Sequence, residues 1–276
     1  MARLLIWCSG EVIREKLARL GDEWQVARFA PPFTGTLGND RLIDVTTRLP
    51  FADGAFEAIY ARRTIEHLAP DEAAAFVHEL NRVAAPGAVI RVSLPDTEAL
   101  AQSYIDAADR ARRAPSPENL RAVHHGRMLL SDQFVRRVPG GELAREIASG
   151  RMSAETVRSV FGDALGANGE VPRGTPPSSR PGLGQRLRER ARLFRGARWV
   201  KEPHASREAH LWIYDRASLP KLLRSAGLAS VREVDSRTSG IAEWSRWKLD
   251  VSDYAAHDFE PSLTMEAVKQ KELAHV

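Results

Sequence analysis

Apolar, strand-like runs alternate with one amphipathic, helix-like segment between Ile43 and Asp96. Short apolar runs at 58–61 and 89–94 flank residues 70–83, in which five apolar residues recur at helical spacing (Ala73, Phe76, Val77, Leu80 and Val83). Strand, helix and strand in this order are typical of a parallel sheet with helices on its faces. Ligands of such sheets bind outside the carboxyl ends of the strands. The stretch therefore predicts a site as well as a fold, because Asp44, Arg62 and Asp96 each follow a predicted strand.

The same alternation is predicted at both ends of the chain, with a different pattern between them. Further strands are expected at 3–7, 25–29, 41–44, 230–234 and 263–268, and further helices at 11–20 and 216–226. Helices are also expected at 100–113, 116–130 and within 141–161, before a Gly-, Pro- and Ser-rich stretch at 162–184. We therefore expect an α/β fold, a Rossmann-like seven-stranded sheet with a mainly helical insertion. Its parts would be 1–96 (first part of the sheet domain), 97–209 (insertion or lid), 210–270 (remainder of the sheet domain) and 271–276 (tail).

Composition narrows the class of protein. The 276 residues are 43% apolar and 28% charged, as in soluble globular domains. No segment approaches the roughly 18 consecutive apolar residues of a membrane span, and the apolar run near the N-terminus is too short for a signal peptide. Cys8 is the only cysteine, which excludes an internal disulfide and a cysteine-rich metal site. We expect a cytoplasmic protein with no membrane partner.

Positive charge is concentrated in the middle of the chain. Residues 107–203 hold 19 Lys and Arg against 10 Asp and Glu, a net charge of +9, and the rest of the chain carries −5. The arginine run at 186–198 is short and has no recognition motif or aromatic stacking series, so we predict no nucleic-acid partner. A solvated face, or a lid that attracts an anionic small-molecule substrate, fits the run better. The insertion could shape the acceptor pocket or mediate homodimerisation.

Motifs in the opening stretch resemble those of the class I S-adenosylmethionine-dependent methyltransferases, in their type 11-like branch. They are Leu49-Pro50-Phe51 with Asp53, Phe56-Glu57 with Ile59-Tyr60, Glu66-His67-Leu68, Arg82-Val83, Pro86-Gly87-Ala88 and Ser93-Leu94-Pro95-Asp96. The stretch His210–Asp215, Leu249-Asp250 and the stretch Pro261–Ala267 resemble later parts of the same branch. The resemblance covers most of residues 1–105 and 208–270.

The resemblance implies S-adenosylmethionine as cofactor and names the residues that would bind it. These are the turn Cys8-Ser9-Gly10 after the first strand, Asp44 beside the adenine amino group with Val45, and Ala61 with Arg62 after the central strand. Two departures accompany the match. The family's glycine loop is reduced to Gly10, and residues 24–29 end without the acid that binds the ribose hydroxyls. Asp44 has a second interpretation as an aspartate that stabilises a turn.

Two histidines are candidate catalytic residues. His67 and His210 could act as the general base that removes a proton from the acceptor, although His67 could instead anchor its loop. Arg63 is a candidate substrate-binding residue, because a guanidinium can bind a carboxylate or phosphate through two hydrogen bonds. Tyr214 is a second candidate, since it lies where the chain re-enters the sheet domain after the insertion. His124 and His125 are adjacent and point in different directions on a helix. We predict no metal site.

Together these features predict methyl transfer from S-adenosylmethionine to an oxygen or nitrogen atom of a small molecule, such as a sugar, a glycan precursor or a biosynthetic intermediate of a natural product. Two alternatives stay open. One is an enzyme of the same fold that no longer uses this cofactor and performs other chemistry on an anionic small molecule. The other is a non-catalytic protein of the same fold that supports a partner.

Overall fold

A seven-stranded sheet forms the centre of the computed structural model, which describes residues 2–7, 20–28, 41–135, 142, 146, 209–250 and 261–271. The strands lie in the order β3-β2-β1-β4-β5-β7-β6. Their bounds are β1 Ala2–Trp7, β2 Trp24–Arg28, β3 Arg41–Leu42, β4 Phe56–Arg62, β5 Ala84–Pro95, β6 Leu228–Glu233 and β7 Ser262–Lys269. Strands β1 to β5 pair in parallel, whereas β7 pairs antiparallel with both β5 and β6. The carboxyl ends of β1 to β5 therefore meet at one edge, and the predicted Rossmann-like α/β fold is confirmed.

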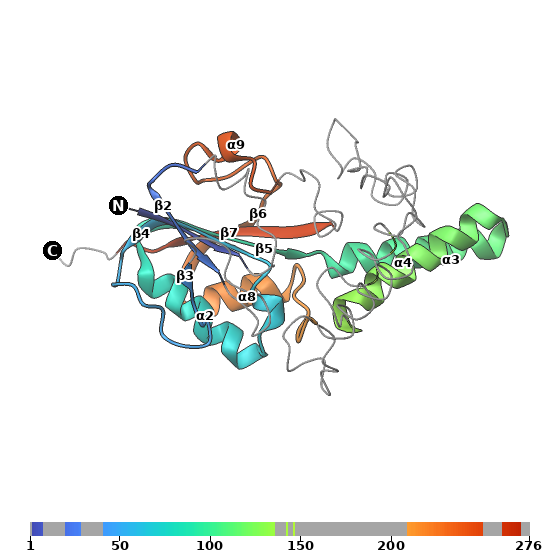
Figure 1. Ribbon diagram of the computed structural model, residues 1–276, viewed down its shortest axis with the longest axis horizontal. Helices are drawn as coiled ribbons and strands as arrows, with labels where there is room; N and C mark the ends of the chain where they lie inside the picture. The colour runs from blue at the N-terminus through green and yellow to red at the C-terminus, as the bar shows by residue number, and fades with distance from the viewer. Residues whose placement is uncertain are drawn as a thin grey trace, which may run out of the picture.

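Two apolar layers cover the sheet on opposite faces (Figure 1). Helices α2 (Pro70–Val83) and α8 (Ser218–Ser225) pack on one face, where Phe76, Leu80 and Leu223 contribute to the larger buried cluster. On the other face lies α9 (Trp244–Trp247), a single helical turn. Ile241, shortly before it in the sequence, is buried in the same layer. The two tryptophans of α9 form a second buried cluster with the side chains of Trp24, Tyr60 and Leu249.

Local sequence signals explain why α2 occupies the predicted residues 70–83. Pro70 is the first helical residue, where a missing N–H costs nothing, and the Glu72 carboxylate accepts a 3.0 Å hydrogen bond from the Ala69 N–H. Near the other end, the Arg82 guanidinium donates to the backbone oxygens of Leu49 and Phe51 at 3.0 and 2.9 Å. Arg82 thereby fastens the turn before β4 to the helix, which positions the strand that carries the candidate site.

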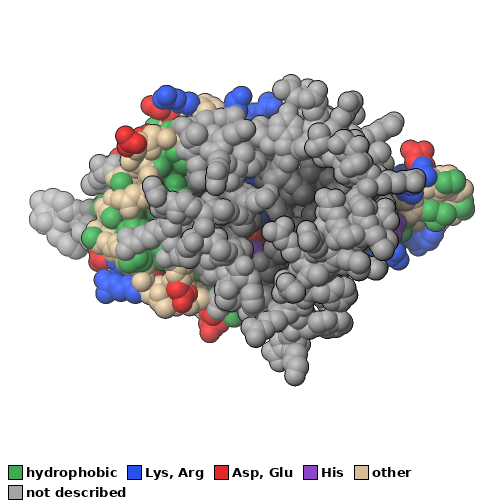
Figure 2. Space-filling view, in the orientation of Figure 1, with side chains coloured by type: hydrophobic (Ala, Val, Ile, Leu, Met, Phe, Trp, Pro, Cys, Tyr) green, Lys and Arg blue, Asp and Glu red, His purple; other side chains and the backbone are tan. Residues whose placement is uncertain are grey.

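An antiparallel pair of helices extends from the end of β5. It consists of α3 (Thr97–Arg113) and α4 (Pro117–Val135), and Figure 1 shows it projecting away from the sheet. Arg110, Arg112 and Arg113 lie in the last turn of α3, and Figure 2 shows basic, acidic and apolar side chains together at the outer end of the pair. These helices begin the predicted insertion, and most of its remaining residues lie outside the described part. Among the described helices, none combines the length and apolar character needed to cross a membrane.

Several element predictions differ from the structure. The strand predicted at 89–94 begins earlier, since β5 starts at Ala84 and runs through Gly87, which has a positive φ of 84°. The single turn α9 was not predicted, since four residues cannot show a helical period. The predicted helix at 11–20 lies outside the described residues except for Leu20. The same holds for the helix at 141–161, apart from Glu142 and Glu146.

Candidate functional site

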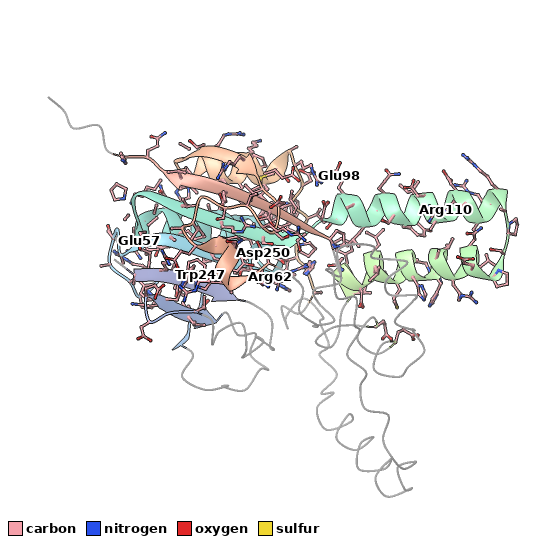
Figure 3. The ribbon with its side chains drawn as sticks, turned by 90° about the horizontal axis from the view of Figure 1, so that it is seen from above. Glu57, Arg62, Glu98, Arg110, Trp247 and Asp250 are labelled. Atoms are coloured by element: carbon pink, nitrogen blue, oxygen red, sulfur yellow. The ribbon has the colours of Figure 1, made fainter. Side chains whose placement is uncertain are left out.

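The chain turns sharply where β4 ends, at the carboxyl edge of the sheet. Arg63 has a φ of +50°, a conformation that costs a residue with a side chain about 1–3 kcal/mol. The Arg63 N–H donates to the Ser93 oxygen at 2.9 Å, and the Thr64 hydroxyl donates to the Arg62 oxygen at 3.0 Å. In Figure 3, Arg62 lies at the opposite end of β4 from Glu57, near the base of the α3–α4 pair. The turn therefore directs the next residues onto the ligand edge.

A short helical turn, η1 (Ile65–His67), places Glu66 and His67 at this edge. Residues distant in sequence join them through backbone hydrogen bonds. The N–H groups of Leu211 and Trp212 both donate to the backbone carbonyl oxygen of Glu66, at 2.8 and 3.3 Å. The His210 N–H donates to the backbone carbonyl oxygen of Gln133 at 2.9 Å. Residues of η1, α4 and the segment that re-enters the sheet domain are thus fixed to one another, with His210 at their junction.

Glu66, His67 and His210 form a buried polar cluster. Their side chains are drawn together so that one potential ligand atom from each lies within 4.8 Å of the others. The two imidazole rings meet edge to face, with centroids 4.7 Å apart and an interplanar angle of 83°. The three residues are only 2%, 8% and 6% exposed. The structure therefore brings together both predicted catalytic histidines, and their chemical roles stay predictions.

Glu66 is the member of the cluster whose ionisation is most strongly altered. Burial raises the pKa of its carboxyl to about 7, and the guanidinium groups of Arg63 and Arg62 oppose that rise. Neither carboxylate oxygen makes a hydrogen bond of standard geometry with a described residue, although the backbone N–H groups of Glu66 and Thr64 also lower this pKa. Burial and the nearby Glu66 carboxylate also raise the pKa of the Tyr214 hydroxyl, to about 12. Tyr214, a predicted substrate-binding residue, therefore belongs to the same electrostatic environment and stays protonated at neutral pH.

The arginines at the end of β4, Arg62 and Arg63, are both buried, at 4% and 5% exposure. Arg63 reaches across the edge, where its Nη2 donates to the Ser262 hydroxyl of β7 at 3.4 Å. Ala61 is also buried, at the end of β4. The two guanidinium groups are close enough to Glu66 to lower its pKa, and they lie at the carboxyl edge, where ligands of parallel sheets bind.

Asp44 and Val45 follow β3 in a tight turn. One Asp44 oxygen accepts hydrogen bonds from the Thr46 N–H at 2.9 Å and from the Thr46 hydroxyl at 2.6 Å, so this exposed aspartate stabilises its own turn. Val45 is buried in the core. The turn role and an interaction with adenine are compatible, since a carboxylate has two oxygens. The predicted cofactor residues Cys8, Ser9 and Gly10 lie outside the described residues.

Glu66 was not among the functional residues predicted from the sequence, whereas Asp96 follows a strand, β5, as predicted. The signal for Glu66 was its place beside His67 directly after a buried strand. Asp96 begins α3 by accepting a 2.9 Å hydrogen bond from the Ala99 N–H, and it pairs with Arg216 at 2.8 Å. Asp96 therefore joins α3 to the segment before α8, and its contacts are those of a structural residue.

Comparison with known proteins identifies part of the chain. Residues 36–92 match the family model described as a methyltransferase domain. No curated protein matches the sequence. A S-adenosylmethionine-dependent methyltransferase from Methanosarcina mazei shares 13% identity over 98% of this chain and 93% of its own, with a TM-score of 0.42. One from Archaeoglobus fulgidus shares 10% over 97% and 86%, with a TM-score of 0.40.

Another similar structure, the [4+2]-cyclase SpnF, shares 16% identity over 98% of this chain and 75% of its own, with a TM-score of 0.39. TM-scores this low support no conclusion about chemistry. The matched segment 36–92, however, contains β4, the whole Glu66-His67 turn and α2, which are the parts that build the ligand edge. The predicted resemblance to methyltransferases is confirmed over this segment of the chain.

Proposed function

We propose that this chain transfers a methyl group from S-adenosylmethionine to an oxygen or nitrogen atom of a small molecule. The observation that carries the proposal is the buried Glu66–His67–His210 cluster, which lies at the carboxyl edge of the sheet and partly within the matched methyltransferase segment. Ligands of open parallel sheets bind at this edge. A buried group of proton acceptors is what an acceptor hydroxyl or amine requires beside it.

The residues at the edge fit the cofactor through their chemistry. The exposed Asp44 carboxylate follows β3, where it can accept a hydrogen bond from an adenine amino group. Val45 follows Asp44 and is buried, and Ala61 is buried near the end of β4. By the family resemblance, Cys8, Ser9 and Gly10 would supply backbone N–H groups. When bound, S-adenosylmethionine supplies a methyl group on a sulfonium that is already activated for displacement.

The protein therefore has two tasks, to orient the acceptor and to accept its proton. Arg63 and Tyr214 border the cluster from the sheet and from the re-entering segment, and we assign them to binding the acceptor. His67 or His210 would take the proton, directly or with the help of another group. Orientation within a buried site can contribute much of the rate enhancement, because the reactants no longer have to find one another.

Isothermal titration with S-adenosylmethionine and with its demethylated product tests the proposal. We expect saturable binding of one ligand per chain, and about tenfold weaker binding for Asp44→Ala, which loses one charged hydrogen-bond acceptor. Asp71→Ala removes an exposed acid from the first turn of α2 and serves as the matched control. Absence of binding of either ligand at millimolar concentration contradicts the proposal.

A second candidate function rests on the buried arginines. Arg62 and Arg63 beside the cluster suit an anionic small molecule, which an enzyme of this fold could transform without S-adenosylmethionine. Activity that persists after exhaustive removal of the cofactor would favour this candidate. Activity that is lost on removal and restored by S-adenosylmethionine would exclude it.

A further inference from the structure

We propose that Glu66, His67 and His210 bind a divalent transition-metal ion, with Zn²⁺ as the ion that their chemistry fits best. Two imidazoles and one carboxylate form a ligand set that proteins use for catalytic Zn²⁺, with open positions left for water or substrate. The sequence predicted no metal site, because the histidines are 143 positions apart and only folding brings them together.

The geometry of the cluster is close to that of a metal centre. One nitrogen from each histidine and one Glu66 oxygen lie within 4.8 Å of one another. Zn²⁺ bonds of about 2.0–2.2 Å in a tetrahedron place ligand atoms roughly 3.4 Å apart. Side-chain rotations that move each atom by about 1 Å would therefore complete the site.

The Glu66 carboxylate is the independent observation that points to a ligand. Its side chain is buried, with a residue exposure of 2%, and neither oxygen makes a hydrogen bond of standard geometry with a described residue. Buried polar atoms are nearly always satisfied, since an unsatisfied one loses its interactions with water without replacement. A metal ion held by this carboxylate and the adjacent imidazoles would supply the missing interaction.

Backbone contacts hold the three side chains in this arrangement. Glu66 and His67 share η1, where the His67 N–H donates to the Thr64 oxygen at 3.1 Å. His210 is fixed by its own N–H, which donates to the Gln133 carbonyl oxygen, and by the next two N–H groups, which donate to the backbone carbonyl oxygen of Glu66. A site on such a fixed framework loses little conformational entropy when the ion binds.

Arg62 and Arg63 influence which further ligands can occupy the open coordination positions of the ion. Both guanidinium groups are close enough to Glu66 to oppose the rise in its pKa, so they also repel a cation. A metal ion with two histidines and one carboxylate keeps a net charge of +1, and the arginines add to it. The open coordination positions should therefore favour an anionic or readily deprotonated ligand.

The role of the ion in catalysis, unlike its binding, rests on the proposed methyl transfer. An acceptor hydroxyl that binds a metal ion has a lower pKa, as metal-bound water has. Its proton would leave to water, and the methyl–sulfur bond would break as the methyl–oxygen bond forms. With the ion bound, His67 and His210 act as its ligands, so the general-base role proposed for the metal-free site passes to water.

Metal-free full-length protein, prepared with a chelator and dialysed, is titrated with Zn²⁺ alone. We expect one Zn²⁺ per chain, at least about 100-fold weaker binding for Glu66→Gln and His210→Ala, and unchanged binding for the surface controls Glu57→Gln and His78→Ala. Co²⁺ in place of Zn²⁺ should give the visible absorption of a nitrogen- and oxygen-ligated ion. Mg²⁺ should compete poorly, because it prefers oxygen ligands.

Absence of a stoichiometric site in the wild type, or equal affinity in Glu66→Gln, would overturn the proposal. Glu66→Gln preserves side-chain shape, so it keeps the test valid if His210→Ala does not fold. Titration of the same metal-free protein with S-adenosylhomocysteine separates the two proposals. Cofactor binding without Zn²⁺ binding refutes only the metal centre, whereas Zn²⁺ binding without cofactor binding refutes only the methyltransferase function.

Discussion

Replacing Arg91 with methionine should destabilise the protein by about 3–5 kcal/mol, a large share of the stability of an ordinary domain. Arg91 is a β5 residue with an exposure of 0%, and it pairs with Asp250 at 2.5 Å and with Glu266 at 2.9 Å. Its guanidinium also donates to the backbone carbonyl oxygens of Asp235 and Thr238 and lies 4.4 Å from the ring centroid of Trp244.

The loss would be large because the variant leaves two buried carboxylates without this cation. Asp250 would keep the Tyr60 hydroxyl, and Glu266 would keep Arg232, the Ser239 hydroxyl and the Gly240 N–H. Removing one partner of a buried ion pair costs far more than replacing the whole pair with apolar groups. The segment 235–250, which covers one face of the sheet, would also lose its main attachment to β5.

Urea denaturation measures the change in the free energy of unfolding. Arg232→Met is the matched control, since the Arg232 side chain is 59% exposed while pairing with the same Glu266, and it should cost less than about 1 kcal/mol. A similarly small loss for Arg91→Met, with an unchanged denaturant dependence, would contradict the assignment of Arg91 as the centre of this cluster.

Glu66→Gln should remove a pH dependence of stability from the metal-free protein. The pKa of Glu66 rises from 4.5 to about 7 on folding because its carboxyl is buried. The stability that the protonated Glu66 carboxyl contributes to the folded protein is therefore fully present below pH 4.5. It declines as the pH rises and is lost above pH 7. At about 1.4 kcal/mol per pKa unit, the wild type should lose roughly 3 kcal/mol relative to the variant across this range.

Urea denaturation at a series of pH values from 4.5 to 8, with a chelator present, measures that difference. Comparing wild type and variant at each pH cancels the titration of all other groups. Glu57→Gln changes an exposed glutamate of β4 and should follow the wild-type profile. Parallel curves for Glu66→Gln and the wild type would show that Glu66 titrates normally.

Local signals in the sequence were strong enough to predict most strands and helices of the sheet domain and their succession along the chain. The helix at 70–83 was predicted with its observed bounds, because Pro70 starts it and five apolar residues mark its buried face. The strands at 58–61 and 89–94 were also found, although each extends beyond its apolar run. Strand ends depend on pairing with neighbours, so the exact bounds need the tertiary structure.

The candidate site was only partly predictable, for the same physical reason. His67 and His210 were each proposed from local motifs, but their 4.7 Å ring contact depends on backbone bonds between η1 and residues 210–212. The altered pKa of Glu66 arises from burial by distant segments, which no local pattern reports. Likewise, the ion cluster at Arg91 joins β5, β7 and residues 235–250, and only the folded sheet brings its members together.

A crystal structure with bound S-adenosylhomocysteine tests the central claim most directly. We expect the adenine beside Asp44, the nucleoside at the carboxyl ends of β1 and β4, and the sulfur facing the space next to Glu66, His67 and His210. In a crystal that also contains an acceptor, the electron density of the acceptor should lie next to Arg63 and Tyr214. A ligand bound elsewhere, or no bound ligand after soaking and co-crystallisation at millimolar concentration, would contradict the assignment of this edge as a methyl-transfer site.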